Sequence, residues 1–324
     1  MKVLHFNLSG FTPSSFFFFI PPFLLNFLKK LSELVAKVEI NELKERLKNI
    51  KLVACDIDGT LLSSDNKVGE GTIQLVSELK NYGVKFTLIT GRVHSASVKY
   101  AKILGVDDPI VSLNGALVKF PEGETIKAFY LPEKKVLKAL ELAEKFFVNI
   151  LFYSEDKVIY TAENTIFPSY IGNLEAETME VDSYYDYTDK VLRVVLSSDR
   201  NYILYRVAHK LEPPFFSNIS TSIYPSLKYD RLTYLEVKRR GISKATGLKY
   251  VRKFFKLKRK EIAGIGDFYN DIEFLKSVGV SVAMKNAVAE VKFNADYVTT
   301  KTNDEDGVAE FLEILLDSKK KTNP

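Results

Sequence analysis

Two pairs of aspartates in this sequence have the spacing of a site that could bind a cation and a phosphate. Asp56 and Asp58 stand two residues apart in the run DIDGT, beside a glycine that permits a tight turn. Asp267 and Asp271 stand four residues apart in GDFYND. Converging carboxylates repel one another unless a cation lies among them, and Mg²⁺ prefers oxygen ligands of this kind together with a phosphate. Lys244, at the predicted start of a helix, would add a positive charge for the same anion.

A cation, a lysine and backbone N–H groups around one aspartate are the setting of in-line phosphoryl transfer. Catalysis there depends on positioning and on neutralising the charge of the phosphate oxygens. We find no convincing Ser-His or Cys-His pair in the sequence. A carboxylate nucleophile remains, which is a known route through an aspartyl-phosphate.

The elements that would position these residues alternate between short apolar strands and amphipathic helices from residue 50 onward. We predict strands at 51–55, 84–89, 110–113, 261–265, 280–283 and 297–299, with helices at 73–79, 93–104, 244–255, 271–278 and 308–316. This alternation predicts an α/β fold, a Rossmann-like doubly wound parallel sheet. Because ligands bind at the carboxyl ends of such strands, the aspartates should meet there.

The middle of the chain has a different pattern, with hairpin-like strands and a few helices. We predict an inserted α+β cap domain at 118–228, between the two parts of the core at 50–117 and 229–324. Residues 1–49 form an N-terminal extension, disordered or amphipathic, whose apolar run at 16–28 contains a Pro pair and is too short to span a membrane.

The composition excludes collagenous, low-complexity and disordered classes, because 46% of the residues are hydrophobic. Lys and Arg number 46 against 41 Asp and Glu, and eleven of the basic residues lie at 238–260, which holds no acid. The simplest use of this local charge is to attract a small phosphate anion. The single Cys55 fits a reducing compartment, and we expect a cytoplasmic protein.

Four motifs stand in order along the chain: DIDGTLL at 56–62, LITGR at 88–92, ISKATGL at 242–248 and GDFYND at 266–271. With them, the sequence resembles the haloacid dehalogenase superfamily, in particular its Cof-type (subfamily IIB) phosphatases with a C2-type cap. The loops NGA at 114–116 and KNA at 285–287 agree as well. The resemblance spans about residues 50–318.

This resemblance implies a role for each matched residue. Asp56 would attack the phosphorus, and Asp58 would protonate the leaving alcohol and then activate water. Mg²⁺ would bind Asp56, the backbone carbonyl of Asp58 and Asp267, with Asp271 supporting the shell. The phosphate would be held by Ile57, Thr90, Gly91, Lys244 and Asn270.

Three more residues would support the site, namely Arg92, Asn114 and Asn286. For Arg92, an ion pair with a surface acid is an equal alternative. The cap would close over the site, exclude water and contact the leaving group, so that it would set the choice of substrate.

The resulting hypothesis is a Mg²⁺-dependent phosphatase for a small phosphorylated metabolite, such as a sugar phosphate or a phosphorylated cofactor. A phosphomutase is the enzymatic alternative. A phosphate-site scaffold that binds nucleic acid or a membrane through residues 238–260 is the alternative of another class, and it leaves the aspartates unexplained. We expect a monomer or homodimer. As partners, we rank a small metabolite first, above nucleic acid and above a membrane contacted by the N-terminal extension.

Overall fold

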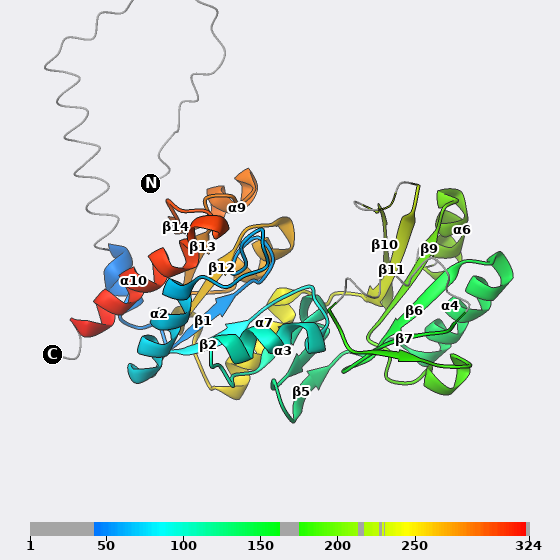
Figure 1. Cartoon of the computed structure of the whole chain (residues 1–324), viewed down its shortest axis with the longest axis horizontal. Coiled ribbons are helices and arrows are strands. Elements are labelled where there is room, and N and C mark those ends of the chain that lie inside the picture. Colours follow the sequence, from blue (N-terminus) through cyan, green and yellow to red (C-terminus); the bar gives the residue numbers. More distant parts are fainter. Residues whose placement is uncertain (1–41, 163–174, 213–216, 227–228, 230, 322–324) are drawn as a thin grey trace, which may run out of the picture. The chain divides into compact units, whose positions relative to one another are not determined.

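The computed structural model describes residues 42–162, 175–212, 217–226, 229 and 231–321 (Figure 1). The chain divides into two units, Met1–Glu42 and Leu43–Pro324, and the site lies in the second. No helix of the described residues is long and apolar enough to span a membrane.

Five parallel strands from the two ends of the second unit form one sheet, in the order β14-β13-β12-β1-β2 (Figure 1). The strands are β1 (Leu52–Cys55), β2 (Lys85–Leu88), β12 (Ile262–Gly266), β13 (Val280–Ala283) and β14 (Tyr297–Val298). The chain adds β2 on one side of β1 and later places β12 on its other side, so the strand order reverses between β1 and β12. Ligands bind at such a point in open α/β sheets. The predicted α/β fold with a parallel core sheet is confirmed.

The helices that accompany this sheet are α2 (Glu70–Asn81), α3 (His94–Ile103), α7 (Lys244–Phe254), α8 (Ile272–Leu275), α9 (Ala289–Asn294) and α10 (Gly307–Lys320), and residues 43–47 are helical as well. In the longer helices α2, α7 and α10, buried residues recur three or four positions apart, as Val76 and Leu79 do in α2, so each of these helices buries one face. The core also contains Leu43, Leu47 and Ile50. The predicted extension 1–49 therefore includes residues that pack in the core.

A second, three-stranded antiparallel sheet consists of β3 (Ile110–Ser112), β4 (Leu117–Lys119) and β5 (Thr125–Ala128). One bridge, between Ile89 and Val111, connects β3 to the end of the parallel sheet. The predicted third strand is thus present, but most of its pairing is with β4. Because Val118 belongs to the same core as β1, the hairpin that we assigned to the insert packs with the core.

The third sheet has six strands in the order β10-β11-β9-β6-β7-β8 (Figure 1). They are β6 (Asn149–Tyr153), β7 (Val158–Tyr160), β8 (Thr178–Glu180), β9 (Arg193–Ser198), β10 (Ile219–Pro225) and β11 (Thr233–Arg239). Helices α4 (Glu133–Phe146) and α6 (Asn201–Leu211) pack on it and share a separate apolar core with β6, β9 and β11.

Strand β11 pairs with β9 and β10 of this sheet, although we predicted its residues as part of the core. The division of the chain into domains stays a prediction. The pairing of the strands points to limits of the insert near residues 131 and 239, instead of 118 and 228.

Candidate active site

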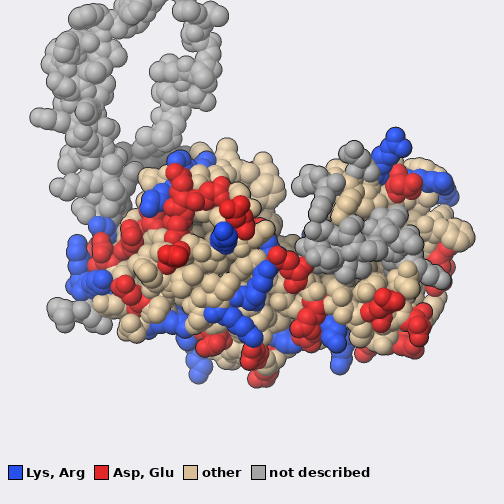
Figure 2. Space-filling model, in the orientation of Figure 1, with Lys and Arg blue, Asp and Glu red and all other residues tan. Residues whose placement is uncertain are grey.

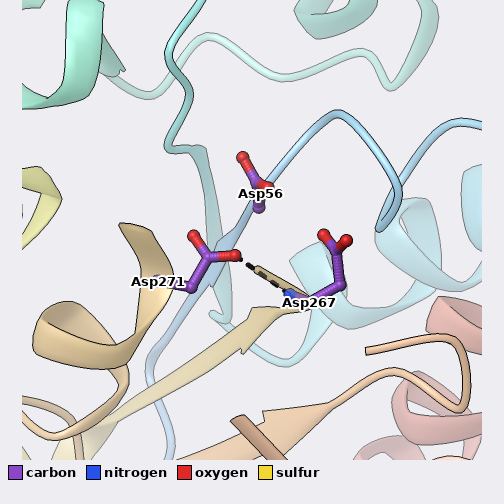
Figure 3. Close-up of side chains that lie close together, drawn as sticks. All are labelled: Asp56, Asp267 and Asp271. Atoms are coloured by element: carbon purple, nitrogen blue, oxygen red, sulfur yellow. Dashed lines mark hydrogen bonds between the residues drawn. The ribbon is translucent and has the colours of Figure 1, made fainter. Parts of the chain in front are cut away.

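Three aspartates meet at the carboxyl ends of β1 and β12. Asp56 directly follows β1 and Asp267 directly follows β12, and the two strands pair in register at Cys55 and Ile265. Asp271 lies in the turn before α8. One carboxylate oxygen of each aspartate lies within 4.8 Å of the others. Figure 3 shows the three side chains close together.

The loop after β12 holds Asp271 in place. The backbone N–H groups of Asp267 and Phe268 both donate to its Oδ2, at 2.9 and 3.0 Å. Figure 3 shows the first of these two hydrogen bonds. A Cβ at Gly266 would lie 2.7 Å from the Asp271 carboxyl carbon, so this strand end needs a glycine. The carboxylate is therefore fixed with its other oxygen, Oδ1, directed at Lys244.

Lys244 lies between two of the carboxylates. It is the first residue of α7, whose N-terminus is capped by Ser243, and its side chain is only 1% exposed. Its Nζ lies 2.6 Å from Asp56 Oδ1 and 2.5 Å from Asp271 Oδ1. Burial opposes the charge of Lys244, but the two carboxylates outweigh it and raise its pKa. The side chain is thus a buried ammonium group.

The single positive charge of Lys244 does not balance the negative charges of three carboxylates. Burial raises the pKa of Asp267 to about 6, and repulsion by Asp271 adds to this, although Thr60 Oγ1 donates a hydrogen bond to Asp267 at 2.6 Å. Burial also raises the pKa of Asp56 well above its usual value, against the effect of Lys244. A cluster of carboxylate oxygens with excess negative charge fits a divalent cation. The residues present therefore suit the metal that we expected.

Asp58 does not join this cluster. We predicted that four acidic side chains converge, but the Asp58 side chain is 57% exposed and accepts hydrogen bonds from Arg92. Its carboxylate binds a cation that the protein itself supplies, which explains why it turns away from the other acids. Asp58 nevertheless lines a hollow of about 380 Å³ that two members of the cluster, Asp56 and Asp267, also line. The other residues of this hollow are Gly59, Gly91, Phe268 and Asn270.

Arg92 combines the two alternatives that the sequence left open. Its guanidinium binds Asp58 with Nε and NH2, and its NH1 binds Glu175 at 3.0 Å. Arg92 thus both lies beside the site and pairs with a second acid.

Four of the predicted phosphate residues lie on the loops after β1, β2 and β12, namely Ile57, Thr90, Gly91 and Asn270, and the fifth, Lys244, begins α7. Asn270 Nδ2 donates to Asn114 Oδ1 at 3.1 Å, which joins the loop after β12 to the loop after β3. Thr90 is fully buried, and its Oγ1 accepts the N–H of Arg92. The Asn114 amide lies 3.3 Å from where a Cβ on Gly91 would be, so Gly91 leaves room for it.

The loop with Asn114 is held in an unusual conformation. Leu113 and Asn114 have φ values of 51° and 53°, a left-handed region that costs energy for residues other than glycine. Gly115 follows with φ 96°, and a Cβ there would lie 2.0 Å from the carbonyl oxygen of Ser243. Close packing against α7 therefore fixes this loop.

The turn formed by the DIDGTLL motif at 56–62 is tied to the rest of the core. The carbonyl of Ile57 accepts the N–H groups of Leu61 and Leu62 at 3.0 Å. Asn286, a predicted supporting residue, donates from Nδ2 to the carbonyl of Gly59 at 2.7 Å and so holds the turn from the side of β13.

Sequence reasoning missed two residues of the site. Thr60 binds Asp267, and its place inside the DIDGT motif was a signal that could have found it. Phe268 lines the hollow with a side chain that is 53% exposed. Only the position next to Asp267 pointed to Phe268.

Comparison with known proteins agrees with this geometry. A family model described as haloacid dehalogenase-like hydrolase matches residues 53–312. The chain is 30% identical to the 5-amino-6-(5-phospho-D-ribitylamino)uracil phosphatase YitU of Bacillus subtilis over 269 residues, which are 81% of this chain and 96% of that protein. It is 28% identical to the phosphatase YwpJ of the same organism, over 82% of this chain and 100% of that protein.

Among solved structures, a haloacid dehalogenase-like hydrolase from Bacteroides thetaiotaomicron is similar, with a TM-score of 0.71 and 29% identity. The similarity covers 82% of this chain and 98% of that one. Fold, motifs and relatives agree over most of the second unit. The chain therefore belongs to the haloacid dehalogenase-like hydrolases, as a phosphatase of the Cof type.

Proposed function

We propose that this protein hydrolyses the phosphate monoester of a small metabolite, with Mg²⁺ as cofactor and an aspartyl-phosphate on Asp56 as intermediate. The observation that carries the proposal is the buried contact of Lys244 with Asp56 and Asp271, beside Asp267. An aspartate with one oxygen held by a buried ammonium group is preorganised to present the other.

Mg²⁺ would be held by Asp56, Asp267 and the backbone carbonyl of Asp58, with Asp271 in support, and would supply charge neutralisation at the phosphate. The chain's own residues provide the rest. Lys244 fixes the nucleophile, and its ammonium group neutralises negative charge where the phosphate enters. Thr90, Gly91, Asn270 and the N–H of Ile57 surround the phosphate.

The reaction has two steps. In the first, a carboxylate oxygen of Asp56 attacks the phosphorus, the bond from phosphorus to the leaving oxygen breaks, and Asp58 gives that oxygen a proton. In the second, Asp58 takes a proton from water, the water oxygen attacks the phosphorus, and inorganic phosphate leaves Asp56. The exposed position of Asp58 on the wall of the hollow supports this role.

The substrate is a small phosphorylated metabolite, either a sugar phosphate or a phosphorylated precursor of a cofactor. The phosphatase YitU, a relative at 30% identity, suggests a first substrate to test, because the compound in its name carries a ribityl phosphate on a pyrimidine ring. The exposed ring of Phe268 at the hollow would be in reach of such a leaving group.

The experiment is a panel of phosphorylated metabolites, measured by phosphate release with Mg²⁺ and with a chelator. We expect release with Mg²⁺, none with the chelator, and none from Asp56→Asn. Asp65→Asn, which changes an exposed aspartate of the same segment, is the matched control and should retain activity. Full activity of Asp56→Asn would overturn the proposal.

The same panel separates the alternatives. Isomerisation of a sugar phosphate without phosphate release would indicate a phosphomutase. A nucleic-acid or membrane scaffold requires a continuous basic surface, but several of the basic residues at 238–260 bind acids: Lys238 binds Glu236, and Arg240 binds Glu212. On the face in Figure 2, basic and acidic side chains lie interspersed. These observations favour a small anion.

A further inference from the structure

We propose that Arg92 is a positioning residue for Asp58, and that Glu175 of the inserted segment holds Arg92 in place. The proposal rests on the acid–base role of Asp58 given above, and it adds a link between that residue and the insert. It assigns a function to two side chains that take no part in the cluster around Asp56.

The contact of Arg92 with Asp58 fixes the direction of the carboxylate. Arg92 Nε lies 3.0 Å from Oδ1 and 2.9 Å from Oδ2 of Asp58, and NH2 lies 2.6 Å from Oδ1. A planar guanidinium that binds both oxygens defines the plane of a carboxylate as well as its position. Without this partner the exposed Asp58 side chain would be free to rotate.

Arg92 is itself held by three groups. Its backbone N–H donates to Thr90 Oγ1, and NH1 donates to Tyr100 Oη at 3.1 Å and to Glu175 Oε2 at 3.0 Å. The Arg92 side chain is only 19% exposed. Partial burial opposes its charge, but the hydrogen bonds and the negative charge of Asp58 raise its pKa on balance, so it stays a cation.

Glu175 is anchored on helix α3. Its Oε2 accepts hydrogen bonds from Lys99 Nζ at 2.5 Å and from Tyr100 Oη at 3.2 Å. The hydrogen bond from Lys99 lowers the pKa of Glu175, which makes it a carboxylate at neutral pH.

The backbone around Glu175 supports a specific placement. Two residues further on, the N–H of Glu177 donates to Ser95 Oγ. Glu175 has a φ of 51°, a conformation that is disfavoured for a residue with a Cβ. Because the backbone is strained at the residue that contacts Arg92, the surrounding structure must hold it in this conformation. This indicates that the contact of Glu175 with Arg92 is specific.

These contacts form one chain, from the insert through Glu175 and Arg92 to Asp58. Protonation of the leaving oxygen requires the Asp58 carboxyl group at the correct position, so removal of Glu175 should impair this step even though Glu175 touches no reacting atom. The defect should depend on how much the leaving group needs a proton. An alkoxide needs one, whereas 4-nitrophenolate leaves without it.

The experiment compares kcat/KM for an alkyl phosphate and for 4-nitrophenyl phosphate, because kcat/KM includes only the steps up to loss of the leaving group. We expect Glu175→Gln to lower kcat/KM about tenfold for the alkyl phosphate and less than about twofold for 4-nitrophenyl phosphate, a fraction of the effect of a whole general acid. In an Asp58→Asn background, Glu175→Gln should have no further effect. Glu122→Gln, which breaks an exposed pair with Lys102 of the same helix, is the matched control.

The inference would be overturned if Glu175→Gln lowered kcat/KM equally for the two substrates, or did not lower it at all. It would also be overturned if Glu175→Gln caused its full loss of kcat/KM in the Asp58→Asn background. The reference variant separates this from the proposed function. If Asp58→Asn itself shows no dependence on the leaving group, the acid role of Asp58 is wrong. If Asp58→Asn shows the dependence and Glu175→Gln does not, only the link to the insert is wrong.

Discussion

At the scale of single residues, charge balance in a buried space explains the site. Asp56, Asp271 and Lys244 are almost fully buried, and each needs the others to compensate for lost hydration. The motif aspartates could be predicted from the sequence because each pair lies within a few residues of chain. The contact of Arg92 with Glu175 could not, because 83 positions separate the two residues and no local pattern specifies it.

Removal of the buried ammonium group should be costly. We expect Lys244→Met to lower the free energy of unfolding by about 3–5 kcal/mol, because it leaves two buried carboxylates without their partner. It should also abolish phosphate release. Urea unfolding measures the first effect. Lys249→Met, which changes an exposed lysine of the same helix, should shift stability by less than about 0.5 kcal/mol. A Lys244→Met protein as stable as that control would contradict the account.

His94 should make stability depend on pH. Burial lowers its pKa to about 4, with a further contribution from Lys119, whereas the Phe120 carbonyl and Asp156 act in the opposite direction. The unfolded chain binds a proton at His94 below a pH of about 6.5, but the folded protein does not until about 4. Stability from this group is therefore complete above pH 6.5 and is lost as the pH falls toward 4, by about 2 kcal/mol at pH 5.

The measurement is urea unfolding at pH 7.5 and pH 5 for the wild type and for His94→Gln. Other groups contribute to the wild-type difference, so the comparison isolates His94. The variant should lose about 2 kcal/mol less than the wild type between the two pH values. Equal losses would show that His94 titrates alike in the folded and unfolded chains.

At the scale of elements, the local sequence pattern predicted most strands and helices of the parallel core. It did not predict which sheet a strand joins. Strands β1 and β12 were predicted because each is a short apolar run before an acid. Strand β11 was missed because its place depends on pairing with β9, about 40 positions earlier in the chain. Helix α8 is shorter than predicted, because the chain leaves the helix after Leu275 and continues through turns at 276–279 to β13.

Packing of the Asn114 loop against α7 gives a prediction at this scale. We expect Gly115→Ala to lower stability by about 3 kcal/mol or more, because its Cβ would overlap the carbonyl of Ser243. Gly105→Ala is the matched control: Gly105 also has a positive φ, 61°, but nothing lies within 4 Å of its would-be Cβ. Its cost should be about 1–2 kcal/mol, from backbone strain alone. Equal costs would mean that the close approach at Gly115 relaxes freely.

At the scale of the whole molecule, the sequence predicted a parallel sheet formed by both ends of the second unit around an insert. It did not predict where the core begins. Leu43, Leu47 and Ile50 pack with β1, but the run before them has no turn or change of composition that marks a boundary. The limits of the insert stay a prediction, and the long-range pairing of the strands, which no local pattern specifies, points to limits other than 118 and 228.

The start of the core can be tested by one substitution. Leu47 is fully buried, so Leu47→Ala should lower stability by about 2–5 kcal/mol. Glu45→Ala, at an exposed position of the same helical turn, should change it by less than about 0.5 kcal/mol. Chemical unfolding of both variants is the measurement. A Leu47→Ala protein with unchanged stability would show that residues 43–49 belong to the N-terminal extension and not to the core.

The central claim is that Asp56 is the nucleophile, and trapping the phosphoryl group on Asp56 during a single turnover tests it most directly. A single turnover in heavy-oxygen water is followed by mass spectrometry of the released phosphate and, after acid quench, of the peptide that contains Asp56. Because water attacks the phosphorus of the aspartyl-phosphate, the bond between phosphorus and the Asp56 oxygen breaks, so Asp56 keeps both of its oxygens and the phosphate gains one oxygen from water. Under the proposed steps, a completed turnover therefore yields phosphate with one heavy oxygen and an unlabelled Asp56, whereas acid quench before completion leaves a phosphoryl group on the Asp56 peptide. An active enzyme whose quenched peptide never carries that phosphoryl group would contradict the account.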